Sequence, residues 1–597
     1  PAFVYRNNSE KLGKNFIKLK VKGEEKNTMA IGSIIDIYSE GQVIRQELIP
    51  TRGFQSSVDY VQTIGLGDRS NIDSIRIVFP DKKQMLVKEP ELNSTLVLDQ
   101  AKAENTRKRG NETKQTWFEE LSTNFEVNKE DRHLDFDYEG LIPKMQSREG
   151  PAIAVADLDG DGNDDLYIGG AYGNSGKIYL QTQPGKLKKI GFDAGENFED
   201  TDAEFSDIDG DNDLDLLVTS GGNFKNARTG LRVYINKGNL KFSDYKVVVY
   251  SPNNVSNVEV ADIDNDGDMD LFIGVYTIPG IYGLKVSSML LENNGKGDFR
   301  NITETAAPGL EDIGMVKSAV FEDLNSDGQP DLIVVGEWMS PRIFLNKDGK
   351  FDLKENELSD YAGLYNSVFA KDLNNDGFKD LVLGNRGDNA SFQASETEPA
   401  KMFVTDFDLN GTIEQIFTKT IDGRDIPLHT KRELAGQVVS IKKQNMKFSE
   451  YSSKSIQDLF KAEVLDKAEV STITNFKSIV AYNDGNANFK IQALPAEAQY
   501  SCVCSINSGD FNKDGKQDLI LAGNNYSLKP QFGRMDASFG TILLNDNNGF
   551  EFADAGTSGL TIKGEVKSLK WLKDKEGNEY LLAGITNEKP KLFKRNE

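Results

Sequence analysis

Aspartates that recur at a fixed spacing are the residues of this sequence best suited to chemistry. The pattern D-x-[DN]-x-D-[GN]-x-x-D occurs six times, each time between two apolar stretches. Calcium prefers about six to eight hard oxygen ligands; positions 1, 3, 5 and 9 can supply side-chain oxygens, and position 7 its carbonyl oxygen. Position 6 is Gly in five copies and Asn in one, residues that tolerate the positive φ of a sharp turn. The spacing therefore predicts calcium-binding loops.

The predicted calcium ligands fall into six loops and one further candidate loop. Positions 1, 3, 5, 7 and 9 of the six loops are Asp157, Asp159, Asp161, Asn163 and Asp165; Asp207, Asp209, Asp211, Asp213 and Asp215; Asp262, Asp264, Asp266, Asp268 and Asp270; Asp323, Asn325, Asp327, Gln329 and Asp331; Asp372, Asn374, Asp376, Phe378 and Asp380; Asp510, Asn512, Asp514, Lys516 and Asp518. The further candidate is Asp406, Asp408, Asn410, Thr412 and Glu414. Asp406 lies only 34 residues after Asp372, whereas the preceding loops are 49 to 61 residues apart, so we assign this candidate to an insertion. The alternative, acidic surface turns without metal, does not explain six copies in one register.

Composition narrows the classes of function. The net charge of -24 disfavours nucleic acid and anionic membranes as partners, because both require an excess of Lys and Arg. Only two histidines, His133 and His429, are available for a zinc hydrolase or a Ser-His-Asp enzyme, and we expect no enzymatic activity. Cys502 and Cys504 stand two apart in a predicted strand, a poor geometry for a disulfide, and are interpreted as packed side chains. No apolar run is long enough to span a membrane.

The spacing of the loops also predicts the elements that position them. Units of about 40–60 residues, each rich in short strands, are typical of propeller blades. In each unit the loop joins a first strand to a second, and a third strand ends at an Asn-containing turn, as at 233–236 and 342–346. A last unit at 568–584 has Leu572 at position 1 and Tyr580 at position 9, so we expect a blade without a metal site. The predicted fold is all-β, with a seven-bladed, integrin-α-like propeller.

Composition and strand spacing predict the domain boundaries. Residues 13–100 are expected to form a small β-sandwich, 101–116 a polar linker and 117–597 the propeller. The first residues resemble the final strand of the chain. We therefore expect 1–12 to end a preceding propeller blade that lies outside this sequence.

The fifth blade is predicted to carry a long, partly helical insertion at about 390–465. The strands at 477–481 and 488–491 would then complete that blade. Just before the insertion, residues 386–388 spell Arg-Gly-Asp, an integrin-ligand tripeptide, which we interpret as a turn of the blade.

The loops resemble the FG-GAP, or VCBS, repeat of integrin α-subunit propellers, in which the same loop holds calcium. Residues 13–100 resemble the ASPIC/UnbV domain; the segments that carry this likeness are 15–19, 30–32, 52–54, 65–67 and 78–81. Together they are similar to the cartilage acidic protein family and its bacterial relatives, especially surface proteins of Bacteroidota. The resemblance implies Ca²⁺ at the matching positions and a secreted or cell-surface protein. Some bacterial relatives are lipoproteins associated with outer-membrane transport systems.

These observations favour an extracellular, calcium-binding protein-interaction module, a subunit of a cell-surface or outer-membrane complex. Its expected partners are proteins, such as an outer-membrane transporter or assembly complex, and not nucleic acid. The alternative is a carbohydrate-binding or polysaccharide-processing surface protein. We expect the partner to dock on the face opposite the calcium loops, where aromatic residues accompany the connections after the second strands: Tyr172, Tyr276, Trp338 and Tyr526.

Overall fold

The computed structural model describes residues 7–104, 116–192, 194–223, 228–546 and 549–596. The chain divides into two compact units, Pro1–Lys114 and Gln115–Glu597. Among the described residues, no helix is long and apolar enough to cross a membrane.

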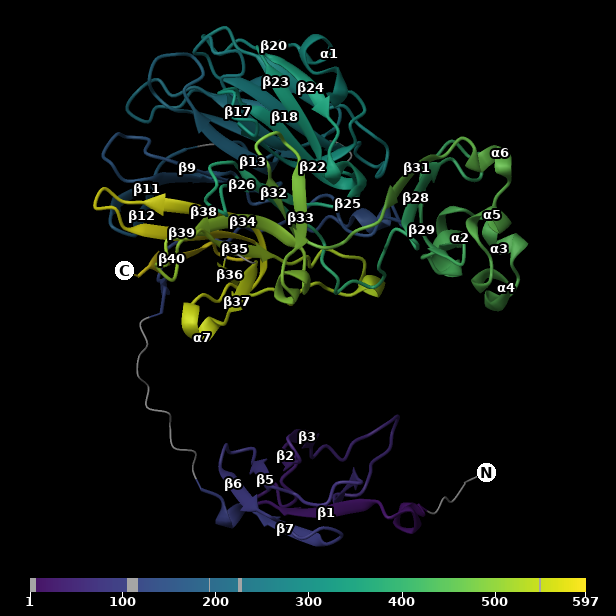
Figure 1. Cartoon of the computed structure of the whole chain (residues 1–597). Coiled ribbons are helices and arrows are strands. Elements are labelled where there is room, and N and C mark those ends of the chain that lie inside the picture. The colour runs from purple at the N-terminus through teal and green to yellow at the C-terminus, as the bar shows by residue number, and fades with distance from the viewer. Residues whose placement is uncertain (1–6, 105–115, 193, 224–227, 547–548, 597) are drawn as a thin grey trace. The chain divides into compact units, whose positions relative to one another are not determined.

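The first unit is built from two small sheets that share one hydrophobic core (Figure 1). One sheet has the order β4 (Gln62–Gly67), β1 (Asn15–Lys22), β7 (Thr95–Asp99), and the other the order β3 (Gln42–Glu47), β2 (Ile34–Ser39), β5 (Ser74–Val78), β6 (Gln84–Lys88). Along β1, Ile17, Leu19 and Val21 are buried and alternate with Lys18, Lys20 and Lys22, as expected for a strand with one face on a core. Half of the segment 1–12, which was predicted to end a preceding blade, lies outside the described residues (1–6), and Ser9–Leu12 form a 3₁₀ turn.

Outside the insertion, the described residues of the second unit form seven antiparallel sheets, six with four strands and one with five. In chain order they are β9 (Ile153–Ala156), β10 (Asp165–Ile168), β11 (Lys177–Gln183) and β12 (Lys186–Lys189); β13 (Glu199–Ser206), β14 (Asp215–Gly221), β15 (Gly230–Tyr234) and β16 (Lys246–Tyr250); β17 (Asn254–Ala261), β18 (Asp270–Thr277), β19 (Met289–Glu292) and β20 (Arg300–Asn301); β21 (Met315–Glu322), β22 (Asp331–Met339), β23 (Arg342–Lys347) and β24 (Lys350–Lys354), with β25 (Gly363–Leu364) beside β22; β26 (Ser367–Lys371), β27 (Asp380–Gly384), β32 (Ile479–Asn483) and β33 (Phe489–Ala493); β34 (Val503–Gly509), β35 (Asp518–Gly523), β36 (Thr541–Asn545) and β37 (Phe550–Ala553); β38 (Glu565–Lys573), β39 (Glu579–Thr586), β40 (Lys591–Arg595) and β8 (Phe118–Leu121). Two short helices, α1 (Thr303–Ala306) and α7 (Ala555–Ser558), follow outer strands.

The seven sheets close into a ring. The first strand of each sheet contacts the first strand of the next, and β38 of the last sheet contacts β9 of the first. Separate hydrophobic clusters fill the spaces between neighbouring sheets, including one between the last sheet and the first. This arrangement is a β-propeller, and the all-β propeller fold predicted from the loop spacing is confirmed.

The last sheet is completed by a strand from the opposite end of the unit. Its outer strand is β8, which pairs antiparallel with β40. The Phe118 side chain of β8 is 1% exposed, and its ring lies 5.5 Å from that of Phe511 and 6.2 Å from that of Trp571. The sequence analysis did not assign a strand to this segment.

The insertion lies between β27 and β32 and contains its own sheet, in the order β30, β29, β28, β31 (Figure 1). Its strands are β28 (Ala400–Thr405), β29 (Glu414–Ile421), β30 (Arg424–Pro427) and β31 (Glu469–Ile473), and its helices are α2 (Lys431–Gln437), α3 (Ser440–Gln444), α4 (Phe448–Ser452), α5 (Ile456–Leu459) and α6 (Ala462–Leu465). One face of the sheet, with Phe403 and Ile416, packs on the helices. The other face, with Met402, Val404 and Phe417, packs on the propeller.

This packing corrects the expectation that aromatic residues stand exposed on the face opposite the calcium loops. Tyr276 and Trp338 are 1% and 7% exposed, because both lie in the cluster that joins the propeller to the insertion sheet. Tyr172 and Tyr526 are only half-buried. The sequence showed which loops carry aromatics but not that the insertion folds back over two of them.

Candidate functional site

Each predicted calcium loop connects the first and second strands of a sheet. Position 9 is the first residue of the second strand in all six ring loops, and Glu414 likewise begins β29 of the insertion. Because connections in an antiparallel sheet alternate between its two ends, the six ring loops lie on one face of the propeller.

The loops share one backbone geometry, which the first loop illustrates. Asp157 accepts hydrogen bonds at Oδ1 from the Gly160 amide (2.9 Å) and at Oδ2 from the Gly162 amide (2.9 Å), and Asp159 accepts one from the Asp161 amide (3.2 Å). The bond from the amide of position 6 to Oδ2 of position 1 recurs in every predicted loop, at 2.8 to 3.0 Å. Position 6 has a positive φ throughout, 87° at Gly162 and 70° at Asn212, as its residue types predict.

Carboxylates converge in four of these loops. Their ligand atoms at positions 1, 3 and 9 lie within 4.8 Å of one another in the loops that begin at Asp157, Asp207, Asp262 and Asp406. The loops that begin at Asp323, Asp372 and Asp510 have Asn at position 3 and therefore bring together fewer carboxylates. The structure thus contains several Asp-rich groups that could hold a metal ion, including the candidate in the insertion.

The position-9 carboxylate connects the loop to its blade by hydrogen bonds. Asp165 accepts hydrogen bonds at Oδ2 from the Leu158 amide (3.1 Å) and at Oδ1 from the Gln181 amide of the third strand (2.8 Å). Burial, followed by repulsion from the other loop carboxylates, raises the pKa of Asp165 and of Asp215 to about 7. The same causes raise the pKa of the corresponding residues Asp270, Asp331 and Asp380 to about 6. A bound cation would offset this repulsion.

Two loop oxygens lack the partner that a cation would supply. Oδ1 of Asp209 and Oδ1 of Asp408, both at position 3, are buried and accept no hydrogen bond from the described residues. A buried carboxylate oxygen without a partner is costly, and Ca²⁺ coordinates such oxygens directly. The residues present therefore fit a calcium ion, with side chains at positions 1, 3, 5 and 9 and the carbonyl at position 7 as its ligands.

Hydrogen bonds between side chains hold the loop of the last sheet. The hydroxyl of Tyr580, at position 9, donates to Oδ2 of Asp574 (2.9 Å), and Nδ2 of Asn578 donates to the same oxygen (2.8 Å). The Lys575 amide donates to Oδ1 of Asn163 in the first ring loop (3.1 Å), which links the last blade to the first. The expectation that this loop binds no metal stays a prediction.

A set of asparagines on the third strands was missed by the sequence analysis. The main-chain amide of each asparagine donates to the position-9 carboxylate in the loop of its own blade. Its side-chain amide donates to the backbone carbonyl of position 2 in the loop of the preceding blade. The side-chain bonds are Asn293 to Ile208 (2.9 Å), Asn346 to Ile263 (2.8 Å), Asn483 to Leu324 (2.8 Å) and Asn545 to Leu373 (2.6 Å), with Gln181 to Lys573 (3.0 Å) in the first blade. The signal available in the sequence was an Asn at the end of four apolar third strands, with Gln181 in its place in the first blade.

Residues 23–105 match the family described as ASPIC and UnbV, and residues 157–218, 207–273 and 323–383 match the FG-GAP-like repeat. The chain is an FG-GAP repeat protein with an ASPIC/UnbV domain. FG-GAP repeats are typical of extracellular or surface protein-interaction modules and of calcium-binding loops. A comparison of this FG-GAP repeat protein with curated proteins finds no match.

Three solved structures resemble the FG-GAP repeat protein weakly. BBS1N, crystallised in complex with ARL6DN, is 10% identical, with a TM-score of 0.38 over 81% of this chain and 98% of that chain. Sqt1 of Saccharomyces cerevisiae is 9% identical, with a TM-score of 0.38 over 76% and 99%. The V. cholerae biofilm matrix protein Bap1 is 12% identical, with a TM-score of 0.31 over 80% and 92%.

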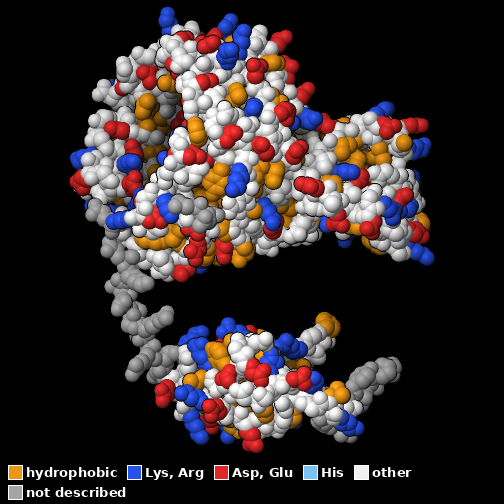
Figure 2. All heavy atoms as spheres, in the orientation of Figure 1, with side chains coloured by type: hydrophobic (Ala, Val, Ile, Leu, Met, Phe, Trp, Pro, Cys, Tyr) orange, Lys and Arg blue, Asp and Glu red, His pale blue; other side chains and the backbone are white. Residues whose placement is uncertain are grey.

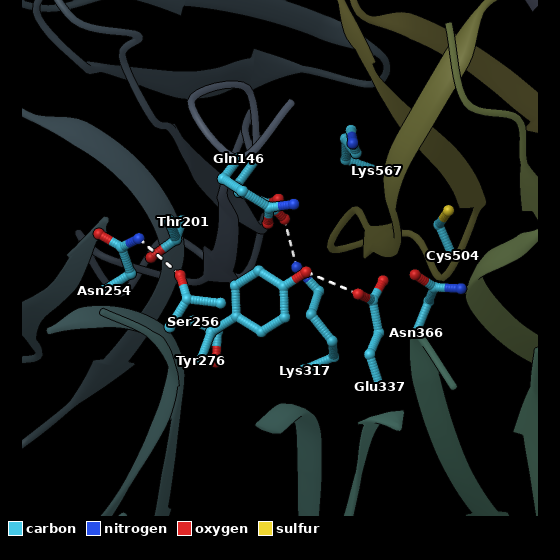
Figure 3. A network of polar contacts seen from close by, with 12 residues as sticks. Gln146, Thr201, Asn254, Ser256, Tyr276, Lys317, Glu337, Asn366, Cys504 and Lys567 are labelled. Carbon is cyan, nitrogen blue, oxygen red and sulfur yellow. Dashed lines mark hydrogen bonds and ion pairs between the residues drawn. The ribbon is translucent and has the colours of Figure 1, made fainter. Parts of the chain in front are cut away.

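A polar chamber of about 150 Å³ lies at the centre of the ring (Figure 3). First strands of five sheets contribute Thr201, Ser256, Lys317, Cys504 and Lys567 to its wall. The sequence could not predict this chamber, because its residues are scattered along the chain and meet only when the ring closes.

Three ion pairs lie around the chamber. Nζ of Lys144 lies 2.8 Å from Oε1 of Glu337, and Nζ of Lys567 lies 3.1 Å from Oε1 of Glu565. Lys317 forms an ion pair with Glu149. Burial alone would raise the pKa of Glu149, but Lys317 and Lys144 hold it at about 2. The sulfur atoms of Cys502 and Cys504 lie 3.6 Å apart as free thiols, in keeping with their interpretation as packed side chains.

Proposed function

We propose that this chain is an extracellular calcium-binding protein-interaction module, a subunit of a cell-surface or outer-membrane complex with no enzymatic activity of its own. One observation carries the proposal: six Asp-rich loops of a single geometry stand on one face of a closed propeller. Repeats of the FG-GAP type support the same reading, since they are typical of surface interaction modules. Acidic and basic side chains are interspersed on the face seen in Figure 2, a surface suited to proteins and not to nucleic acid.

Calcium acts as a structural cofactor in this proposal. When bound, it supplies positive charge to each loop. The side chains at positions 1, 3, 5 and 9 would hold the ion. The position-9 carboxylate also accepts hydrogen bonds from the loop and from the third strand, so the bound ion would restrict the motion of the second and third strands as well. The metal thereby stiffens the ring that presents the opposite face and the insertion to a partner.

The second ring loop allows a matched test of calcium binding. Asp209→Ala removes the side-chain oxygens of a position-3 ligand whose Oδ1 is buried without a partner, whereas Asp213→Ala changes a position-7 residue that would contribute only its carbonyl. We expect Asp209→Ala to lose about one bound Ca²⁺ per chain relative to the wild type, and Asp213→Ala to lose none. Elemental analysis after dialysis measures the bound metal. A calcium-free wild-type protein, or equal losses in the two variants, would contradict the proposal.

The surface-complex part requires a separate experiment. Cross-linking on intact cells that produce the protein, followed by mass spectrometry, should identify a recurrent protein partner whose yield falls when calcium is chelated. Binding to polysaccharide without any protein partner would instead favour a carbohydrate-binding protein. Turnover of polysaccharide would contradict the absence of enzymatic activity.

A further inference from the structure

An apolar pocket lies where the insertion meets the propeller. Its volume is about 40 Å³, and its wall includes Tyr282, Trp338, Phe392, Phe417, Leu528 and Met535. The lining residues Phe392 and Phe532 are half-buried, whereas the rings of Tyr282, Trp338 and Phe417 are buried, so the two half-buried rings form the rim of the pocket.

One charged side chain on this wall has no counter-ion. Arg386 is 7% exposed, and its guanidinium lies 5.4 Å from the Phe392 ring and 5.9 Å from the Phe476 ring. Its Nε has no hydrogen-bond partner, and none of the described residues forms an ion pair with it. Burial lowers the pKa of the Arg386 guanidinium, as expected for a cation taken out of water.

The neighbouring buried charges are already satisfied. Glu337, the carboxylate on the same wall, accepts a hydrogen bond from the hydroxyl of Tyr276 at 2.7 Å (Figure 3). It also accepts one from the hydroxyl of Tyr282 at 2.7 Å and pairs with Lys144 at 2.8 Å. Lys317 and Lys567 likewise form ion pairs, with Glu149 and Glu565 respectively. Unlike Lys144, Lys317 and Lys567, Arg386 forms no ion pair with a described residue, and Glu337 attracts it only at longer range.

Burial of a cation without a counter-ion is costly, and aromatic faces recover only part of that cost. An anion that enters the pocket would remove the imbalance. The guanidinium fork matches a carboxylate bidentately, and the aromatic wall suits an apolar group next to it. A dianion such as phosphate fits less well, because only one positive charge is unmatched.

We propose that this pocket binds the carboxylate of a small organic acid with an apolar or aromatic body, which Arg386 holds through its guanidinium. Arg386 is the first residue of the Arg-Gly-Asp tripeptide at 386–388. Its burial in the pocket gives it a role other than the exposed adhesive one. The backbone positions it, because the Gly387 amide donates to the Phe476 carbonyl (2.7 Å) and the Asp388 amide to the Gln499 carbonyl (2.9 Å). The inference does not depend on calcium or on the surface complex.

The test compares benzoate with its neutral analogue benzamide in calorimetric titrations of the full chain. We expect benzoate to bind and benzamide to bind about tenfold more weakly or worse, because benzamide lacks the charge. Arg386→Gln should remove the preference for benzoate. Arg534→Gln is the matched control: Arg534 is exposed, lies near the pocket over Tyr526, and has Asp536 as its partner. This control should bind benzoate like the wild type.

A peptide arm distinguishes the two sources of such a carboxylate. A short peptide that ends in Phe is titrated with a free C-terminus and with a C-terminal amide. Tighter binding of the free-acid peptide than of benzoate assigns the pocket to the end of a polypeptide, and weaker binding assigns it to a free small acid. Both results support a carboxylate site.

Stability separates loss of binding from loss of folding. Removal of an unmatched buried charge should leave the melting temperature of ligand-free Arg386→Gln no lower than that of the wild type. If this variant does not fold, Phe392→Ala provides a second test, because the loss of a half-buried rim ring should weaken benzoate binding without exposing the core. Absence of benzoate binding to the wild type, equal binding of benzamide, or undiminished binding to a folded Arg386→Gln would overturn the proposal.

Discussion

Single polar residues connect neighbouring blades of this propeller. Asn346 is 2% exposed; its Nδ2 donates to the Ile263 carbonyl of the preceding blade (2.8 Å), and its Oδ1 accepts from the Gly349 amide (3.0 Å). Because a buried carbonyl that loses its donor keeps its desolvation cost, these asparagines contribute more than an ordinary surface hydrogen bond.

Asn346→Ala should lower the free energy of unfolding by about 2–3 kcal/mol, because it removes one buried and one partly buried hydrogen bond. Asn346→Asp should be at least as destabilising, since it places a carboxylate oxygen against the Ile263 carbonyl. Urea titration measures the change. Asn124→Ala, at an exposed position after β8, serves as the control and should have little effect. Equal stabilities of Asn346→Ala and this control would show that the bond between blades is unimportant.

The residues that could be predicted from the sequence are those whose partners are close in the chain. Positions 1 to 9 of each calcium loop lie within nine residues, so their spacing alone shows the site. Arg386 and the asparagines could not be assigned in this way. Asn483 bonds to Leu324, 159 residues away, and only the closed ring brings them together.

At the scale of elements, the insertion is a small sheet-and-helix layer with a histidine in its core. His429 is 2% exposed, and its Nε2 accepts a hydrogen bond from the Phe417 amide (3.2 Å). Burial, aided by the nearby Lys529, lowers the pKa of His429 to about 4. The neutral imidazole is therefore the form that fits.

This environment predicts a pH dependence of stability. The unfolded chain takes up a proton near the ordinary pKa of His, about 6.5, whereas the folded protein does so only near 4. The stabilisation is thus present at neutral pH and is lost as the pH falls between these values. From about pH 7 to about pH 5, His429 should cost the wild type about 2 kcal/mol of unfolding free energy.

His429→Gln should remove this contribution, because Gln keeps an acceptor for the Phe417 amide but does not titrate. Urea titrations at both pH values give the difference in unfolding free energy between variant and wild type. The contributions of the other titrating groups cancel in this difference. His133→Gln, a change at the other histidine of the chain, should leave the dependence in place. The same pH dependence in His429→Gln as in the wild type would contradict the assignment.

The outline of the insertion could be predicted, but not its packing. Its helical composition and the loop at Asp406 are local signals. Whether its sheet would fold back over Tyr276 and Trp338 depended on shape complementarity between distant surfaces. An aromatic residue after a strand has the same appearance in the sequence whether it lies in a core or on a docking surface.

For the whole molecule, the decisive contact is the pairing of β8 with β40, which closes the last sheet. Phe118→Ala should cost about 3–5 kcal/mol of unfolding free energy, because it removes a fully buried ring from the cluster with Phe511 and Trp571. Glu119→Ala changes an exposed neighbour in the same strand and should have little effect. Thermal melting of the two variants tests this directly. If both melt like the wild type, β8 is dispensable for closure.

The β8–β40 pair also determines when the ring can close during protein synthesis. Its paired residues stand 471 to 477 positions apart, so β8 leaves the ribosome long before its partner strand exists. Until then the Phe118 ring has no cluster to enter, and the nascent propeller remains an open arc with unpaired strand edges at both ends. Contacts of such long range form slowly, and exposed edges invite association with other chains. Chaperone dependence of the nascent protein should therefore be greatest just before its last strand emerges.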